Sequence, residues 1–318
     1  MNADEINLQS FGFKPVAKSG LRPALSFADY LEADGVSNSL LTAARTPQHA
    51  VAYLAARENR TESEPQRFGR LSHTRILTPE LCRTVEHPQT YATGKRTVEI
   101  INGNKQSIAE FKPWNWNATV CKTWRDIKRA DGFEPISSKD EERLCRMSDA
   151  LFSHKGAADL FSSLKSREIT CFSKLQFDGR DVACKIRADF VPRAALADYK
   201  TCVDASPAAF QKSISEFGYH RQACFYRFVW NACNQAGATT RAQRAEFFFV
   251  AQEKTAPFAV AVFEMTNDAF DVAFEEIRQR MANVVVAIET PAAELTAAAY
   301  GAKPFKITLP EWHVNRVA

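Results

Sequence analysis

Two acidic residues and a lysine near the middle of the chain have the types and the spacing for phosphate chemistry. Asp189 ends one apolar run, and nine residues later Asp198 and Lys200 lie two apart in a short β-like segment, residues 196–201. Because side chains of a strand alternate between its faces, Asp198 and Lys200 are expected on the same face. Two carboxylates there could share a hard cation such as Mg²⁺, which prefers oxygen ligands. The ammonium group could orient an attacking water or offset charge that develops on a phosphate.

The apolar surroundings of these acids make a purely structural role less favoured. An Asp-x-Lys tripeptide alone is weak evidence, since exposed strands often carry such a pair. Asp198, however, follows the apolar residues 194–197, and Asp189 follows Ile186 and Ala188. An acid in an apolar strand is costly unless it is paired or bound to a metal. Two such acids with a lysine therefore indicate a functional site.

Five further residues each allow two interpretations. Glu168, which opens the preceding strand, is either part of the same cleft or a surface acid. Arg187 either contacts phosphate or pairs with one of the acids, and His73 is either a ligand or a hydrogen-bonded core histidine. Gln222 and Tyr226 lie four apart on one helix face, where they either line a site or pack a core.

A small sheet with helices around it is expected to position these residues. Residues 168–177 and 182–191 are rich in β-branched and aromatic side chains and are joined by the hairpin-turn dipeptide Asp178-Gly179. Three more strands are predicted, as is an α/β arrangement around a mixed sheet. The predicted strands are 196–201, 245–252 and 258–265, and the predicted helices are 37–45, 46–57, 68–77, 137–154, 206–233 and 267–288.

Between residues 83 and 135 the periodicity is weak, and no element is assigned. Within it, residues 112–129 combine three tryptophans with five lysines and arginines. Such a segment could stack bases and follow phosphates. The alternative is a solvated amphipathic element.

Length and composition indicate a globular protein, and its cysteines indicate a cell compartment in which thiols stay reduced. The chain has 318 residues, a net charge of +4 and eight cysteines, none in a C-x-x-C pair or at zinc spacing. Neither a signal peptide nor a membrane-spanning stretch is apparent, so we expect a cytoplasmic protein with no membrane partner. We expect residues 1–20 to be a flexible arm, and residues 21–318 to be a single elaborated domain with its catalytic core at about 137–265.

Taken together, the order and spacing of these motifs resemble a known nuclease family. The matching elements resemble the PD-(D/E)XK nuclease domain of exodeoxyribonuclease VIII, the RecE-type phage recombination exonuclease. They are also similar to the broader group that contains lambda exonuclease and RecB-like nuclease domains. The resemblance rests on Gly69-x-x-x-His73, Glu168 before the hairpin, Asp189, Asp198-Tyr199-Lys200-Thr201, and Tyr219-His220-x-Gln222-x-x-x-Tyr226.

The resemblance implies a fold and a role for each matched residue. The fold would be α/β (α+β), with a restriction-endonuclease-like core, a small mixed sheet flanked by helices, and an N-terminal helical elaboration. The implied metal ligands are His73, Asp189 and Asp198, with Lys200 activating water or stabilising charge. Glu168 matches a further catalytic position. Gln222, Tyr226 and Arg187 are the candidate DNA contacts.

The chain departs from the family pattern in three respects. Ala188 occupies the place of the usual proline before the first acid. A helical glutamate found in some relatives has only Glu141 and Glu142 as candidates. The cysteines that hold an iron–sulfur cluster in some related nucleases are unmatched.

The expected activity is Mg²⁺-dependent degradation of double-stranded DNA from its ends, in the 5′ to 3′ direction, with Mn²⁺ able to substitute. The resemblance implies a ring-like homo-oligomer and a single-strand annealing protein as partner. Two alternatives remain open. One is a PD-(D/E)XK nuclease of other polarity or an endonuclease, and the other is an inactive DNA-binding module of the same fold.

Overall fold

The structure is a computed structural model that describes most of the chain. The described residues are 20–22, 25–56, 62–102, 104–193, 195–233, 245–290, 295 and 307. Apart from Gly20, which begins a strand, the predicted flexible arm lies outside them. The sequence also predicts an extended tail at 304–312, of which the structure describes only Ile307.

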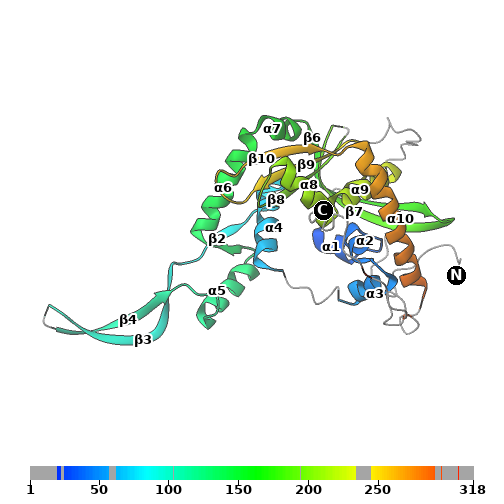
Figure 1. Cartoon of the computed structure of the whole chain (residues 1–318). Coiled ribbons are helices and arrows are strands. Elements are labelled where there is room, and N and C mark those ends of the chain that lie inside the picture. The colour runs from blue at the N-terminus through cyan, green and yellow to red at the C-terminus, as the bar shows by residue number, and fades with distance from the viewer. Residues whose placement is uncertain are drawn as a thin grey trace.

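One six-stranded mixed sheet forms the centre of the molecule (Figure 1). Only β8 and β9 are parallel neighbours, while the other adjacent pairs are antiparallel. The turn of the β6–β7 hairpin has positive φ at both Asp178 and Gly179, as its dipeptide predicts. The strand order is β1 (Gly20–Arg22), β6 (Leu164–Phe177), β7 (Arg180–Pro192), β8 (Leu196–Cys202), β9 (Phe247–Glu253) and β10 (Val260–Glu264).

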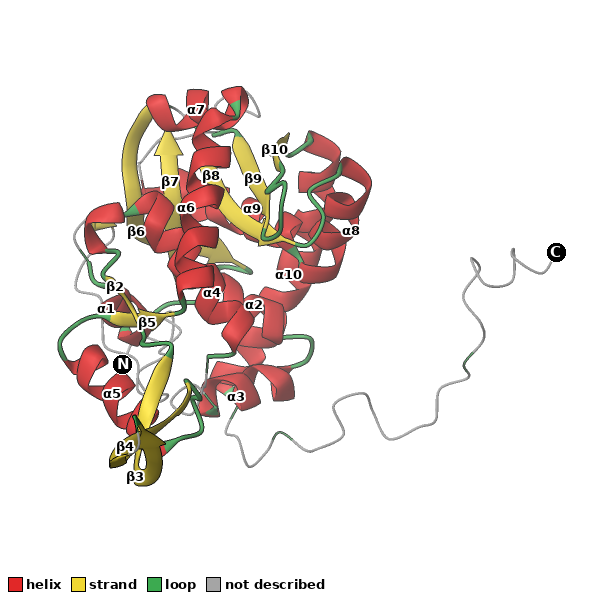
Figure 2. Ribbon diagram, turned by 90° about the vertical axis from the view of Figure 1, so that its left-hand side faces the viewer, coloured by secondary structure: helices red, strands yellow, loops and turns green. Residues whose placement is uncertain are grey.

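Helices cover both faces of this sheet, which confirms the predicted fold class. Alternate residues of the central strands belong to separate cores: Leu196 and Phe249 to one, Tyr199 and Val250 to the other. The first core is closed by α2 (Asn38–Ala43), α3 (Pro47–Ala55), α8 (Pro207–Phe217), α9 (Tyr219–Cys233) and α10 (Asn267–Glu289). The second is closed by α4 (Glu64–Leu77), α6 (Ser138–Ser153) and α7 (Lys155–Ser162), with α4 and α6 in front of the strands in Figure 2.

The helix predicted over residues 206–233 is wrong in one respect, because it is two helices. Gly218 separates α8 from α9 with a left-handed φ of 69°. A Cβ at this position would lie 2.0 Å from an Arg221 guanidinium nitrogen. Glycine is the residue that adopts this conformation most readily, so α8 ends here and α9 begins in a new direction.

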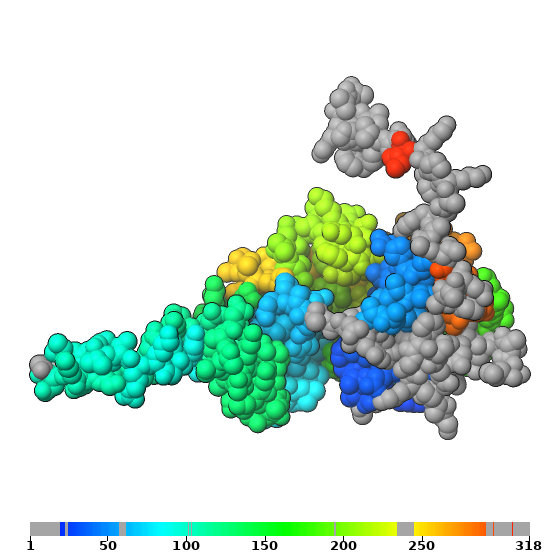
Figure 3. Space-filling model, turned by 90° about the horizontal axis from the view of Figure 1, so that it is seen from below, coloured from blue at the N-terminus to red at the C-terminus, as the bar shows by residue number. Residues whose placement is uncertain are grey.

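The region without a predicted element contains a protruding hairpin. Strands β3 (Thr90–Ile101) and β4 (Asn104–Pro113) extend away from the body, followed by α5 (Thr119–Ala130) (Figures 1 and 3). The base of the hairpin lies beside a short parallel pair, β2 (Thr84–Glu86) and β5 (Glu134–Ile136). Trp114 contacts His87, Trp116 and Trp124 with ring centroids 5.0–5.4 Å apart. These tryptophans thus pack against one another and attach α5 to the hairpin.

Candidate active site

The predicted residue Asp189 contacts β8 where the pairing between β7 and β8 stops. Among the described residues, Phe190 and Ala197 form the only paired position between these strands. Beyond it, the Tyr199 backbone N–H donates a 2.9 Å hydrogen bond to the Asp189 carboxylate. A side chain therefore replaces the strand ladder, and the Asp189 carboxylate is held beside the backbone of β8.

Asp198 is buried and contacts two neighbours through its carboxylate. Its side chain is 2% exposed, one carboxylate oxygen accepts a 2.7 Å hydrogen bond from Gln222, and the other lies 2.5 Å from the Lys200 ammonium. Burial alone would lower the pKa of Lys200, but the carboxylates of Asp198 and Asp189 outweigh it and raise this pKa. Lys200 is therefore a fixed positive charge next to the Asp198 carboxylate.

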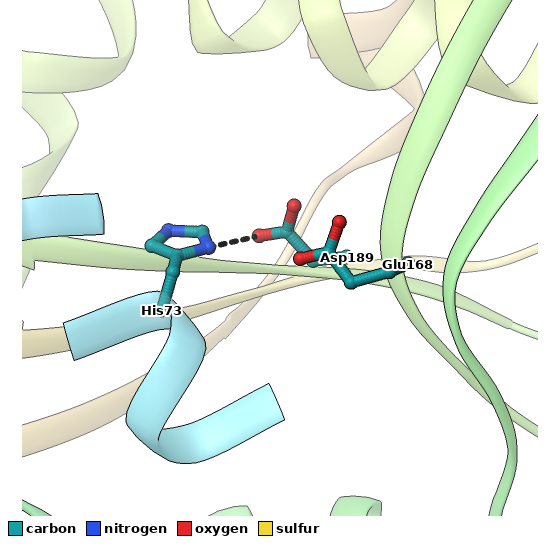
Figure 4. Close-up of side chains that lie close together, drawn as sticks. All are labelled: His73, Glu168 and Asp189. Atoms are coloured by element: carbon teal, nitrogen blue, oxygen red, sulfur yellow. Dashed lines mark ion pairs between the residues drawn. The ribbon is translucent and has the colours of Figure 1, made fainter. Parts of the chain in front are cut away.

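A second group of side chains could hold a cation. His73 on α4, Glu168 on β6 and Asp189 on β7 each offer one ligand atom, and these atoms lie within 4.8 Å of one another (Figure 4). His73 Nδ1 is 3.5 Å from the nearer Asp189 oxygen. The imidazole also contacts the Tyr199 ring, with centroids 5.2 Å apart. The fold therefore brings His73 to the acids across almost a hundred residues of sequence.

Glu168 enters this group through an unusual backbone conformation. It lies between the paired positions Arg167–Phe190 and Ile169–Ala188, and it has a φ of 48°, which residues other than glycine rarely adopt. Arg187 Nε donates a 2.7 Å hydrogen bond to Glu168, and another of its nitrogens donates to Thr170 and to the Leu25 carbonyl. Arg187 thus pairs with an acid, the second of its two interpretations, and so orients Glu168.

The electrostatics of the group suit a divalent cation. Burial, followed by the nearby Asp198 carboxylate, raises the pKa of Asp189 well above its ordinary value. Burial and the Lys200 ammonium lower the pKa of His73 to about 4, so the imidazole is neutral near pH 7. Neutral imidazole and carboxylate oxygens are metal ligands, and a cation would relieve the repulsion among the acids. His73, Glu168 and Asp189 therefore fit a bound cation, with Asp198 alongside.

The helical residues Gln222 and Tyr226 support Asp198 from one side. Gln222 is buried and bonds to Asp198 directly, while the Tyr226 side chain bonds to Gln222. Burial and the neighbouring Tyr30 raise the pKa of Tyr226 well above its ordinary value, so its hydroxyl stays protonated. Tyr30, on α1 (Phe27–Glu32), was not singled out from the sequence because no local pattern distinguishes it from a core aromatic residue.

The two candidates for a helical glutamate lie outside this group. Glu141 on α6 forms an ion pair with Arg75, and the carboxylate of Glu142 lies 3.9 Å from Arg146. The two carboxylates of the group, Glu168 and Asp189, are both supplied by strands.

The family model described as "PDDEXK-like domain of unknown function (DUF3799)" matches residues 37–293 of the chain. The chain belongs to this family. This assignment and the mixed sheet flanked by helices agree, and the matched range includes His73, Glu168 and Asp189. It also includes the hairpin β3–β4.

One solved structure shows a similar fold. The chain is similar to a protein from Eubacterium rectale named "Putative exonuclease", with a TM-score of 0.53 and 11% identity over 91% of this chain and 97% of that one. A structure of LHK-Exo in complex with dAMP has a TM-score of 0.24 and 13% identity over 54% of this chain and 84% of that one. No curated protein matches the chain. Within the described residues, no helix is long and apolar enough to cross a membrane.

Proposed function

We propose that this PDDEXK-like protein is a Mg²⁺-dependent exodeoxyribonuclease that degrades double-stranded DNA from its ends in the 5′ to 3′ direction. The observation that carries the proposal is the meeting of His73, Glu168 and Asp189 beside the Asp198–Lys200 pair. These side chains come from one helix and three strands. Their charges are costly to bury together unless a cation and a phosphate complete the arrangement.

Each residue has a role that follows from its position. His73, Asp189 and Asp198 would hold the cation, with Glu168 as a further carboxylate oriented by Arg187. When bound, Mg²⁺ or Mn²⁺ would supply Lewis-acid charge to the scissile phosphate and acidify a water. Lys200 would offset the negative charge that develops on the phosphate. Gln222 would fix the Asp198 carboxylate, and Gln222 and Tyr226 would lie next to the DNA.

Exonuclease specificity and biological context come from the resemblance to RecE-type enzymes. We include in the proposal a role in phage-type recombination and repair, a ring-like homo-oligomer, a single-strand annealing partner and a cytoplasmic location. We also propose that the described core belongs to a single nuclease domain. The name of the Eubacterium rectale protein supports the exonuclease part.

The direct test compares linear with covalently closed circular duplex DNA in Mg²⁺. The wild type should degrade only the linear form, and Asp198→Ala and Lys200→Ala should each lose about 10³-fold or more in rate. Full activity in either variant would remove the assignment. Cleavage of the closed circle would instead show an endonuclease, and DNA binding without cleavage under any metal would show a binding module.

A further inference from the structure

The protruding hairpin and the helix after it hold the excess positive charge of the chain. This basic arm, residues 90–130, contains eight lysines and arginines and three acids. The remaining residues contain 33 basic and 34 acidic side chains, so the arm is +5 whereas the remainder is −1. Figure 3 shows the β3–β4 hairpin reaching well beyond the body of the molecule. The net charge of +4 is therefore unevenly distributed, and the positive excess lies in the basic arm.

Several cations of the basic arm are available to a partner. Lys95, Lys105 and Lys122 are exposed and have no ion-pair partner within the described residues. Arg96 bonds to the side chain and backbone of Ser107, and this contact holds its exposed guanidinium in place across the two strands. In the active site, by contrast, Lys200 and Arg187 are both paired with acids.

The charges lie along two regular surfaces. On α5, Lys122, Arg125 and Arg129 recur at three- and four-residue spacing, which places them on one side of the helix. On the hairpin, Ile100 lies opposite Lys105, so both share a face with Arg96. The α5 surface thus offers a row of three cations and the hairpin face offers a pair, at positions that the backbone sets.

The hairpin is a two-stranded ribbon whose apolar side chains are left exposed. A two-stranded hairpin alone is only marginally stable in water, yet Val98 and Ile100 are 66% and 72% exposed. Its β3 strand of 12 residues is roughly 40 Å long at the usual rise per residue. A two-stranded ribbon fits the major groove of DNA, where apolar side chains can contact thymine methyl groups.

We propose that the basic arm binds duplex DNA outside the active site, through its phosphates. The inference rests on the proposed function, because a polyanionic substrate is the occupant whose charge complements an arm of +5. The base of the arm is joined to the helix that carries His73. Glu134 lies 2.9 Å from Arg129 of α5 and 3.3 Å from both Arg67 and Arg70 of α4. DNA bound along the arm would therefore be held next to the cation site.

The test measures binding of the full chain to a fluorescent duplex of roughly 30 base pairs in EDTA, so that no cleavage intervenes. The arm variant is Lys95→Gln/Lys105→Gln. Its matched control, Lys155→Gln/Lys165→Gln, removes two exposed lysines of the body. Removing two phosphate contacts should weaken binding about tenfold at moderate salt and reduce the slope of log K against log salt by about 2. The control should match the wild type.

Two results would overturn the inference. One is unchanged affinity and salt slope in the arm variant. The other is a change in its oligomeric state, measured by light scattering, with unchanged DNA binding, since the arm would then be a protein–protein surface. Cleavage by the wild type in Mg²⁺ is measured separately. Arm-dependent binding without cleavage would contradict the proposed function alone, whereas cleavage with arm-independent binding would contradict this inference alone.

Discussion

The active site and the basic arm use charge in opposite ways. In the active site, Asp198 is buried and each of its oxygens contacts a neighbour, and Lys200 is held by the acids around it. In the basic arm, Lys95 and Lys105 are exposed and their charges face solvent. Buried charges interact strongly over short distances and shift one another's pKa, whereas exposed charges attract polyanions over longer distances and are screened by salt.

Because of this difference, we expect the active site to determine the cleavage rate and the basic arm to determine the affinity for DNA. A change in the active site should alter the rate and the requirement for a cation, with little effect on the salt dependence of binding. A change in the basic arm should do the reverse. Side chains of the active site, and side chains in or beside the basic arm, can be exchanged separately, which makes the comparison open to experiment.

The largest contrast is expected between two histidines, His73 of the active site and His87 of the arm base. His73→Ala removes a candidate ligand, so the cation concentration needed for half-maximal activity should rise about 100-fold or more. His87 stacks on Trp114 with an interplanar angle of 11° and is not part of the cation group. His87→Ala should leave the cation requirement unchanged. A metal titration of DNA cleavage measures both variants.

Equal cation requirements in the two histidine variants would show that His73 is a core residue and not a ligand. Circular dichroism of both proteins identifies any loss of folding. Without this control, unfolding could be mistaken for weaker cation binding.

A second contrast concerns the stability of the metal-free protein. In the unfolded chain Asp189 ionises near pH 4, whereas in the folded protein its pKa is raised by burial and by Asp198. Between these values the folded state binds the extra proton, so stability falls as pH rises through this window. Asp189→Asn removes the free-energy cost of ionising a buried carboxyl group. Its amide oxygen can still accept the hydrogen bond from the Tyr199 N–H. It should stabilise the protein at pH 8 by roughly 1–2 kcal/mol and abolish cleavage.

Thermal unfolding in EDTA at pH 5 and pH 8 checks this, with the gain in Tm expected only at the higher pH. Because a cation must displace the proton from Asp189, the cation affinity of the wild type should also rise with pH. A lower Tm for Asp189→Asn at pH 8 would contradict the account of strained, like-charged acids.

The two regions also differ in how well the sequence predicts them. Asp189, Asp198 and Lys200 lie within twelve residues on two strands with strong β patterns, so their proximity follows from local structure. His73 could be included only through a resemblance, because its contact with Asp189 depends on how α4 packs on the sheet. Glu168 has a left-handed backbone conformation that no residue propensity indicates.

The basic arm escaped prediction for a physical reason. Its strands are exposed on both faces, so one face of β3 mixes the charged Arg96 with the apolar Val98 and Ile100 and is not uniformly apolar, as a buried face would be. Residues 112–129 gave only a compositional signal, and the structure shows that Trp114 and Trp124 pack together. Burial of one face gives a strand its alternation of apolar and polar residues. An element with both faces exposed lacks this alternation, so the sequence does not reveal it.

The smallest expected effect concerns Glu134, which joins the two regions. Burial alone would raise the pKa of Glu134, but Arg129 and Arg70 outweigh it and lower this pKa. Its contribution to stability is therefore present at neutral pH and lost as pH falls below about 4.5. Glu134→Gln should cost about 1 kcal/mol, because partly exposed ion pairs contribute little. The control Glu64→Gln, whose carboxylate is 77% exposed and contacts Arg67, should cost almost nothing.

Hydrogen exchange shows where this cost falls. In Glu134→Gln, the amides of α5 and of the β2–β5 pair should exchange faster, while those of β7 and β8 should not change. The cation requirement should also stay at the wild-type value, because His73 is held by α4 packing and by Tyr199. If the cation requirement rises with the exchange rate of α5, the arm and the active site are one coupled unit, and DNA bound on the arm would influence the chemistry directly.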